Sequence, residues 1–116
     1  MIESKIQNLP EERYPSFGNN AAYLKPCREF AKLRKLLDAA GIQWEDASEP
    51  DPVFPIHRTH GDGFSAIWGA GSYGREFGLL EVMVAGGDGD PVGWLTADEA
   101  LELVLGGKEA DDADEA

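Results

Sequence analysis

Cysteine is nearly absent from this sequence of 116 residues, in which Cys27 is the only one. An internal disulfide requires two cysteines, so a secreted scaffold held together by disulfides is excluded. Long apolar runs are absent as well, and no stretch approaches the roughly 20 residues that a membrane-spanning helix requires. The first residues also lack the charged and then apolar pattern of a secretory signal. The sequence therefore predicts a soluble protein of a reducing cytoplasm.

Positive charge is scarce. Lysine and arginine contribute 10 residues against 22 aspartates and glutamates, which gives a formal charge of −12 at pH 7. A protein that binds nucleic acid or an anionic membrane gathers lysine and arginine on one face, so neither partner is favoured here. The acidic excess suits attraction to a basic surface of another protein, and its simpler interpretation is solubility.

The length fits one domain, and 42% apolar with 28% charged residues is typical of a globular chain. Residues 1–24 have no sustained hydrophobic period, so we expect an irregular N-terminal segment. Residues 108–116 hold five acids, one lysine and no large apolar side chain, which predicts a disordered acidic tail. A single folded domain over residues 25–107 is expected. Residues 1–107, which are the irregular segment and this domain together, contain 17 acidic and nine basic residues and have a formal charge of −8.

The strongest helix signal covers residues 25–40. Pro26 suits the first turn of a helix, and Gly41 suits a left-handed C-terminal cap. Apolar residues recur at steps of three and four, as on one helix face: Phe30, Leu33, Leu36, Leu37 and Ala40. The same segment carries five of the ten basic residues: Lys25, Arg28, Lys32, Arg34 and Lys35. We expect these basic side chains to form the solvated face of the helix.

Four segments have the length and pattern of strands: residues 42–46, 53–60, 64–68 and 77–84. The second and third are joined by Gly61-Asp62-Gly63, which supplies the positive φ angles of a tight hairpin. A second helix begins at Thr96, which forms a capping box with Glu99, and is expected to end at Gly106-Gly107. The predicted fold class is α+β, with two helices packed on a three- to four-stranded antiparallel sheet.

Residues 69–74, with the sequence GAGSYG, superficially resemble a phosphate-binding loop. A Walker loop continues with lysine and then serine or threonine, whereas Gly74 is followed by Arg75 and Glu76. A dinucleotide fingerprint requires a parallel βαβ unit, which the strand pattern does not predict. The loop is therefore interpreted as a connection between strands, and no cofactor is expected.

His57, His60 and Asp62 form the one group that could hold a metal ion. If residues 57–60 are extended, however, the two histidines project to opposite faces, because strand side chains alternate and the spacing is three. A zinc site also needs three or four ligands, and Cys27 is the one soft donor. No metal is expected. A metal-dependent hydrolase that uses these three residues stays an alternative, and it predicts bound zinc or manganese.

Acidic residues are concentrated in two further segments. Six are candidate contacts for a partner protein: Glu45, Asp46, Glu49 and Asp51 in one segment, Asp88 and Asp90 in the other. If the segments adjoin in the fold, their carboxylates form a patch that a basic, nucleic-acid-binding surface would bind in place of phosphates. This hypothesis fails if the carboxylates are dispersed or are neutralised by the basic residues of helix 25–40.

Two stretches carry a resemblance. Residues 33–44, LRKLLDAAGIQW, and residues 93–101, GWLTADEAL, resemble small acidic proteins of phages and mobile elements. In those proteins a helix and strand of the form LRxLLDxxGIxW come first, and an LTxEEA helix closes the domain. The group has no common activity, so the resemblance implies no catalytic residues. It implies a protein that binds and disables a host protein in the bacterial cytoplasm, as anti-CRISPR proteins do.

The leading hypothesis is therefore a non-enzymatic inhibitor of a host defence complex. An anti-CRISPR protein that covers the basic nucleic-acid-binding surface of a CRISPR effector is its specific form. Such a protein binds neither nucleic acid nor a membrane directly and uses no cofactor. Two alternatives remain: the metal-dependent hydrolase, and an accessory protein whose acidity serves solubility alone.

Overall fold

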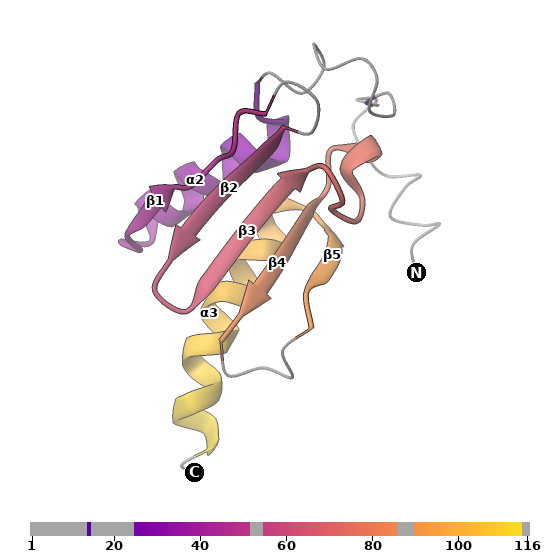
Figure 1. Ribbon diagram of the computed structural model, residues 1–116. Coiled ribbons are helices and arrows are strands. Elements are labelled where there is room, and N and C mark those ends of the chain that lie inside the picture. The colour runs from indigo at the N-terminus through magenta and orange to yellow at the C-terminus, as the bar shows by residue number, and fades with distance from the viewer. Residues whose placement is uncertain (1–13, 15–24, 52–54, 86–89, 115–116) are drawn as a thin grey trace.

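A helix, five strands and a second long helix follow one another in the described part of the chain (Figure 1). The computed structural model describes Tyr14 and residues 25–51, 55–85 and 90–114, with side chains described as far as Gly106. The candidate Asp88 and the segment 1–24, apart from Tyr14, lie outside the described residues. The elements are α2 (Arg28–Ala39), β1 (Trp44–Asp46), β2 (Ile56–Gly61), β3 (Phe64–Gly69), the 3-10 helix η2 (Arg75–Phe77), β4 (Leu80–Val84), β5 (Val92–Leu95) and α3 (Ala97–Asp114).

Helix α2 buries the apolar face that its spacing predicts. The helix begins three residues later than predicted, at Arg28, and the buried Cys27 is its N-cap residue. The thiol of Cys27 contacts the carbonyl oxygen of Gly78 at 3.5 Å. The helix ends before Gly41, whose φ of +73° is the left-handed conformation that closes many helices. The fully buried residues of the apolar face are Phe30, Leu33 and Leu37.

The described strands form one antiparallel sheet in sequence order, β1-β2-β3-β4-β5. Strands β2 and β3 form the predicted hairpin, with Gly63 at a φ of +82° in its turn. The sheet has one strand more than the upper number predicted, namely β5. That strand has four residues, which include Gly93 and a Trp94 at a φ of +62°. Such a short and irregular segment shows no strand period in the sequence.

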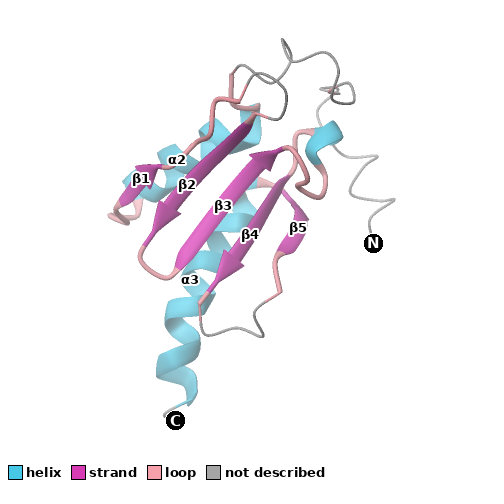
Figure 2. Ribbon diagram, in the orientation of Figure 1, coloured by secondary structure: helices cyan, strands magenta, loops and turns pink. Residues whose placement is uncertain are grey.

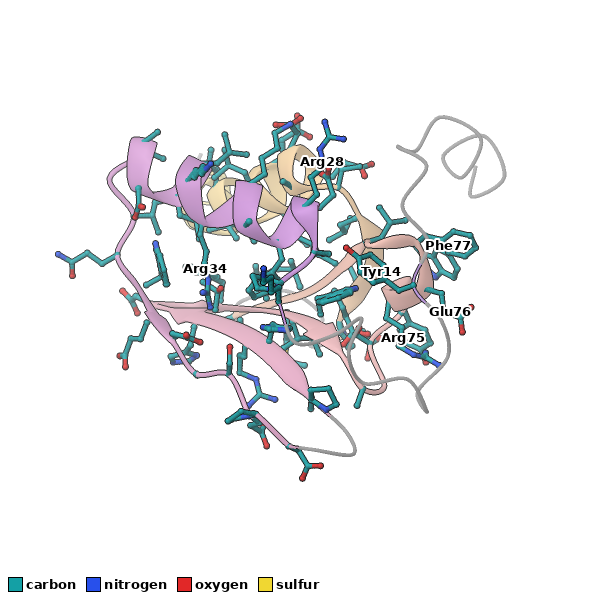
Figure 3. All side chains as sticks on the ribbon, turned by 90° about the horizontal axis from the view of Figure 1, so that it is seen from above. Tyr14, Arg28, Arg34, Arg75, Glu76 and Phe77 are labelled. Carbon is teal, nitrogen blue, oxygen red and sulfur yellow. The ribbon has the colours of Figure 1, made fainter. Side chains whose placement is uncertain are left out.

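Both helices cover the same face of the sheet (Figures 2 and 3). Thr59, Ala66 and Val82 stand side by side across β2, β3 and β4 and are fully buried. Because strand side chains alternate, these positions face the helices and their neighbours face the other side. No helix of the described chain covers that open face. The two-layer α+β domain that the sequence predicts is therefore confirmed.

Helix α3 begins with the predicted capping box. The Glu99 N–H donates to the Thr96 hydroxyl at 3.3 Å, and the Thr96 N–H donates to the Glu99 carboxylate at 3.0 Å. The carboxylate of Glu29 in α2 accepts the N–H of Ala97 at 2.7 Å, which joins the two helices.

The C-terminal part of α3 extends beyond the sheet (Figure 1). The predicted helix end at Gly106-Gly107 is wrong, since the helix continues to Asp114. Gly106 does not adopt the left-handed conformation by which a glycine ends a helix. The disordered acidic tail predicted for residues 108–116 concerns the chain in solution and stays a prediction.

Candidate functional site

Four of the acidic candidates lie along one edge of the sheet. The chain from Glu45 to Asp51 runs beside β2, because β1 pairs with β2 and Glu49 forms a bridge with Ile56. Asp90 precedes β5, which forms the opposite edge. The structure therefore separates Asp90 from the other four, and the described candidates do not form one continuous patch. All five are exposed: Glu45, Asp46, Glu49, Asp51 and Asp90.

Two carboxylates of this edge are bound by arginines. Asp46 Oδ1 lies 3.1 Å from Arg34 Nη2, and Glu49 Oε2 lies 2.7 Å from Arg58 Nη1. Asp46 also accepts hydrogen bonds from the Ser48 hydroxyl at 2.5 Å and the Ser48 N–H at 3.0 Å. These two donors, together with Arg34, hold the pKa of Asp46 below its ordinary value. Asp46 and Glu49 are thus partly neutralised within the domain.

Arg34 has a structural role that the charge pattern does not predict. The sequence places it on the solvated face of α2, but its side chain lies between α2 and the sheet (Figure 3). Its Nε donates to Thr59 Oγ1 at 2.7 Å, and its Nη2 donates to the Arg58 carbonyl oxygen at 3.2 Å. The guanidinium lies 4.9 Å from the ring centre of Phe30 and 4.6 Å from that of Trp44. Arg34 follows Phe30 by four residues, so both lie on the buried side of the helix. From this spacing the buried position of Arg34 could have been predicted.

A groove of about 750 Å³ lies at the end of the β2–β3 hairpin. Asp62 in the hairpin turn lines it, and so do the aromatic residues Trp44 and Phe64. Glu45 and Asp62 are exposed, and neither side chain makes a hydrogen bond or ion pair with any described residue. A row of lining side chains crosses four strands in register on the open face: Glu45, His60, Ser65 and Met83.

The candidate metal ligands do not converge. His57 lies on the helix side of β2 with its ring 5.5 Å from that of Trp68, whereas His60 is exposed on the other face. The prediction that the two histidines project to opposite faces is confirmed. In the part of the chain that the structure describes, no group of three or more His, Cys, Asp or Glu residues could hold a metal ion. The hydrolase alternative has no ligand set among these residues.

The glycine-rich loop uses its polar groups internally. Ser72 is fully buried, and its hydroxyl accepts the Gly69 N–H at 3.0 Å and donates to the Gly69 carbonyl oxygen at 2.9 Å. Gly74 has a φ of +90°, and a Cβ there would lie 3.2 Å from the Cα of Trp94. The loop connects β3 to η2 and β4, as predicted, and it also allows the close approach of β5.

Comparison with protein-family models, with curated proteins and with solved structures gives no match. The resemblance to phage and mobile-element proteins therefore stays a prediction. Among the described helices, none combines the length and the apolar character needed to cross a membrane. The fold and the site define a two-layer α+β domain whose antiparallel sheet has an acidic groove at one corner.

Proposed function

We propose that the protein is a non-enzymatic binding protein that docks onto a basic surface of a partner protein. The observation that carries the proposal is the pair Glu45 and Asp62. Both are exposed, both line one groove, and neither has a cationic partner among the described residues. Their charge therefore acts on whatever approaches from solvent. The net charge of −12 adds a long-range attraction for cationic surfaces.

The fold narrows the contacts that this proposal uses. Asp46 and Glu49 are bound by arginines of the same chain, and Asp90 belongs to the far edge of the sheet. A continuous row of carboxylates that imitates a phosphate strand is therefore not what supports the proposal. The proposal is supported by the acidic groove and by the neighbouring β1 edge of the sheet. The exposed acidic segment that begins at Glu45 extends along this edge to Asp51.

The proposed partner class comes from the resemblance. It is a host defence complex with a basic nucleic-acid-binding surface, such as a CRISPR effector in the bacterial cytoplasm. The proposed action is blockade, in which the bound protein competes with nucleic acid for the same surface. Inhibition by blockade reaches its maximum at stoichiometric amounts and involves no turnover.

The test adds the full chain to a panel of purified CRISPR effector complexes and measures DNA binding and cleavage. Inhibition is expected at about 50 mM NaCl and should weaken strongly at about 500 mM, because salt screens attraction between exposed charges. The double variant Glu45→Lys/Asp62→Lys should lose inhibition. The matched control Asp90→Lys/Glu102→Lys makes the same charge change at exposed positions outside the groove and should retain it.

Two results would contradict the proposal. Equal loss of inhibition in both double variants would show that net charge, rather than the groove, determines binding. Failure to bind any effector at either salt concentration would remove this partner class. Acidity would then serve solubility alone.

A further inference from the structure

We infer that the groove at the end of the β2–β3 hairpin binds an arginine-containing peptide segment of the partner. This inference rests on the proposed function and specifies which part of the partner binds in the groove. The hairpin places unpaired carboxylates, an exposed apolar side chain and the open face of the sheet in one groove. Glu45 was predicted from the sequence as a partner contact and Asp62 as a candidate metal ligand, but their meeting in one groove with Met83 was not predicted.

The strand register gives the groove an acidic end and an apolar end. Glu45, His60, Ser65 and Met83 occupy neighbouring positions on β1, β2, β3 and β4. Neighbouring strands lie roughly 4.8 Å apart, so about 14 Å separates the backbone of Glu45 from that of Met83. The hairpin turn with Asp62 forms the adjoining wall. A ligand that spans the row therefore meets carboxylates on one side and a thioether on the other.

The apolar lining of the groove includes one exposed side chain, Met83, and the ring of Phe64, which is 4% exposed and belongs to the core. Met83 is 47% exposed, and among the exposed large hydrophobic residues of the described chain, Tyr73, Met83 and Val92, it is the one that lines the groove. Methionine adapts its shape to different partners. The ring of Phe64 fills the space beside Gly61, where a Cβ would lie 2.2 Å from the ring. A side chain at Gly61 would displace that ring.

Arginine matches this arrangement of groups. Its stem is apolar and its head is a planar cation that binds a carboxylate through two parallel hydrogen bonds. In a segment with several arginines, the stem of one can lie against Met83 while the head of another reaches Glu45 or Asp62. A lysine offers the same charge without the planar pair of donors, so it should bind more weakly. The volume of about 750 Å³ falls within the roughly 300–1,000 Å³ of ligand pockets and accommodates a short segment.

The experiment uses the ¹⁵N-labelled full chain and two octapeptides, one of alternating glycine and arginine and one of alternating glycine and lysine. At low ionic strength the arginine peptide should shift the amide signals of Glu45, His60, Asp62 and Ser65. It should bind several times more tightly than the lysine peptide. The variant Glu45→Gln/Asp62→Asn should weaken binding about tenfold, and the matched control Asp90→Asn/Glu102→Gln less than about twofold. Circular dichroism should show that all variants fold, because the four side chains are exposed.

Each other outcome overturns the inference in a distinguishable way. Signal shifts at acidic residues outside the groove, or equal weakening in both double variants, overturn the groove and leave the proposed function standing. No binding of either peptide overturns the inference alone, because the proposed function is decided separately by inhibition of the effector complexes. Without peptide, the amide signals of the groove and of the exposed basic residues of α2 could shift as the protein concentration rises. That result would show that the groove binds a second copy of the chain, and it would overturn the inference of a peptide ligand.

Discussion

The carboxylate of Asp46 accepts hydrogen bonds from the hydroxyl and the N–H of Ser48 and from Arg34, and these donors lower its pKa from the ordinary 3.8. A depressed folded-state pKa means stability that is present above the unfolded pKa and lost as pH falls through the folded value. We expect Asp46→Asn to lower the free energy of unfolding at pH 7. The loss should be below about 1 kcal/mol, because the side chain is 58% exposed and solvent screens the interaction.

The measurement is urea unfolding of both proteins between about pH 7 and pH 3, a range that crosses the ordinary carboxyl pKa. The difference between wild type and Asp46→Asn should shrink as the pH falls below about 4. Glu45→Gln is the matched control, since it removes one charge from the neighbouring position without removing a hydrogen bond or ion pair to a described residue. A difference that stays constant with pH in Asp46→Asn, as in the control, would contradict the role of the lowered pKa.

Single residues show where sequence patterns suffice and where they fail. The strand period is local, so it correctly placed His57 and His60 on opposite faces of β2. The pairing of Arg34 with Asp46 depends on how α2 packs against the sheet, and no local pattern contains that information. The sequence shows that the segment from Glu45 to Asp51 is rich in acidic residues. It does not show which of these carboxylates form ion pairs within the domain.

Arg34 couples three elements, because it joins α2 to β1 and β2. Its Nε is the described partner of the Thr59 hydroxyl, which is fully buried. Lysine keeps the charge but not the rigid set of donors, so Arg34→Lys leaves this hydroxyl without its donor. A buried polar group that loses its partner costs about 1–3 kcal/mol, and we expect a loss of unfolding free energy of about 1–2 kcal/mol.

Chemical denaturation measures this loss, with Arg28→Lys as the control. Arg28 lies on the same helix (Figure 3), is exposed, and its side chain makes no hydrogen bond or ion pair with a described residue. The control should stay within about 0.5 kcal/mol of wild type, as is usual at exposed positions. If both substitutions cost the same, the coupling through Thr59 contributes nothing measurable.

Among the elements, the two helices and the central hairpin followed from the sequence, whereas β5 and the end of α3 did not. The hairpin has glycine at the turn and β-forming residues on both sides, so local and global preferences agree. Strand β5 is held by neighbours instead: the Trp94 N–H donates to the Tyr73 carbonyl oxygen at 3.3 Å, and Gly93 packs against the Tyr73 side chain. Such support comes from a loop that is distant in the sequence.

The order of the strands explains why Asp90 lies far from the acidic segment that begins at Glu45. In a sheet whose strands follow sequence order, segments that come first and last along the chain lie at opposite edges. Glu45 belongs to β1 and Asp90 precedes β5, so the full width of the sheet separates them. A prediction of four strands places Asp88 and Asp90 in a turn after the last strand. It does not determine how far they lie from Glu45. The sequence therefore missed β5 and left open whether Asp90 lies near Glu45.

The net charge acts on the molecule as a whole. At about 0.01 M ionic strength the Debye length is about 30 Å, longer than the radius of gyration of 14.2 Å, so the 22 acidic residues repel one another over much of the protein. At about 0.1 M the Debye length falls to about 10 Å. The described ion pairs oppose this repulsion, but each pair has an exposed acidic partner and contributes about 1 kcal/mol or less. We therefore expect added salt to stabilise the folded state.

Thermal unfolding at these two ionic strengths, followed by circular dichroism, tests this expectation. Relief of about 1 kcal/mol of repulsion should raise the Tm by about 4–8 °C for a domain of this size. A chain that ends at Gly107 carries a formal charge of −8 instead of −12, so its Tm should rise less. A Tm that falls with salt in the full chain would show the reverse balance. Salt screens attraction and repulsion alike. A falling Tm would therefore mean that the attractive pairs, Arg34 with Asp46 and Arg58 with Glu49, stabilise the folded state by more than the repulsion among the acidic residues destabilises it.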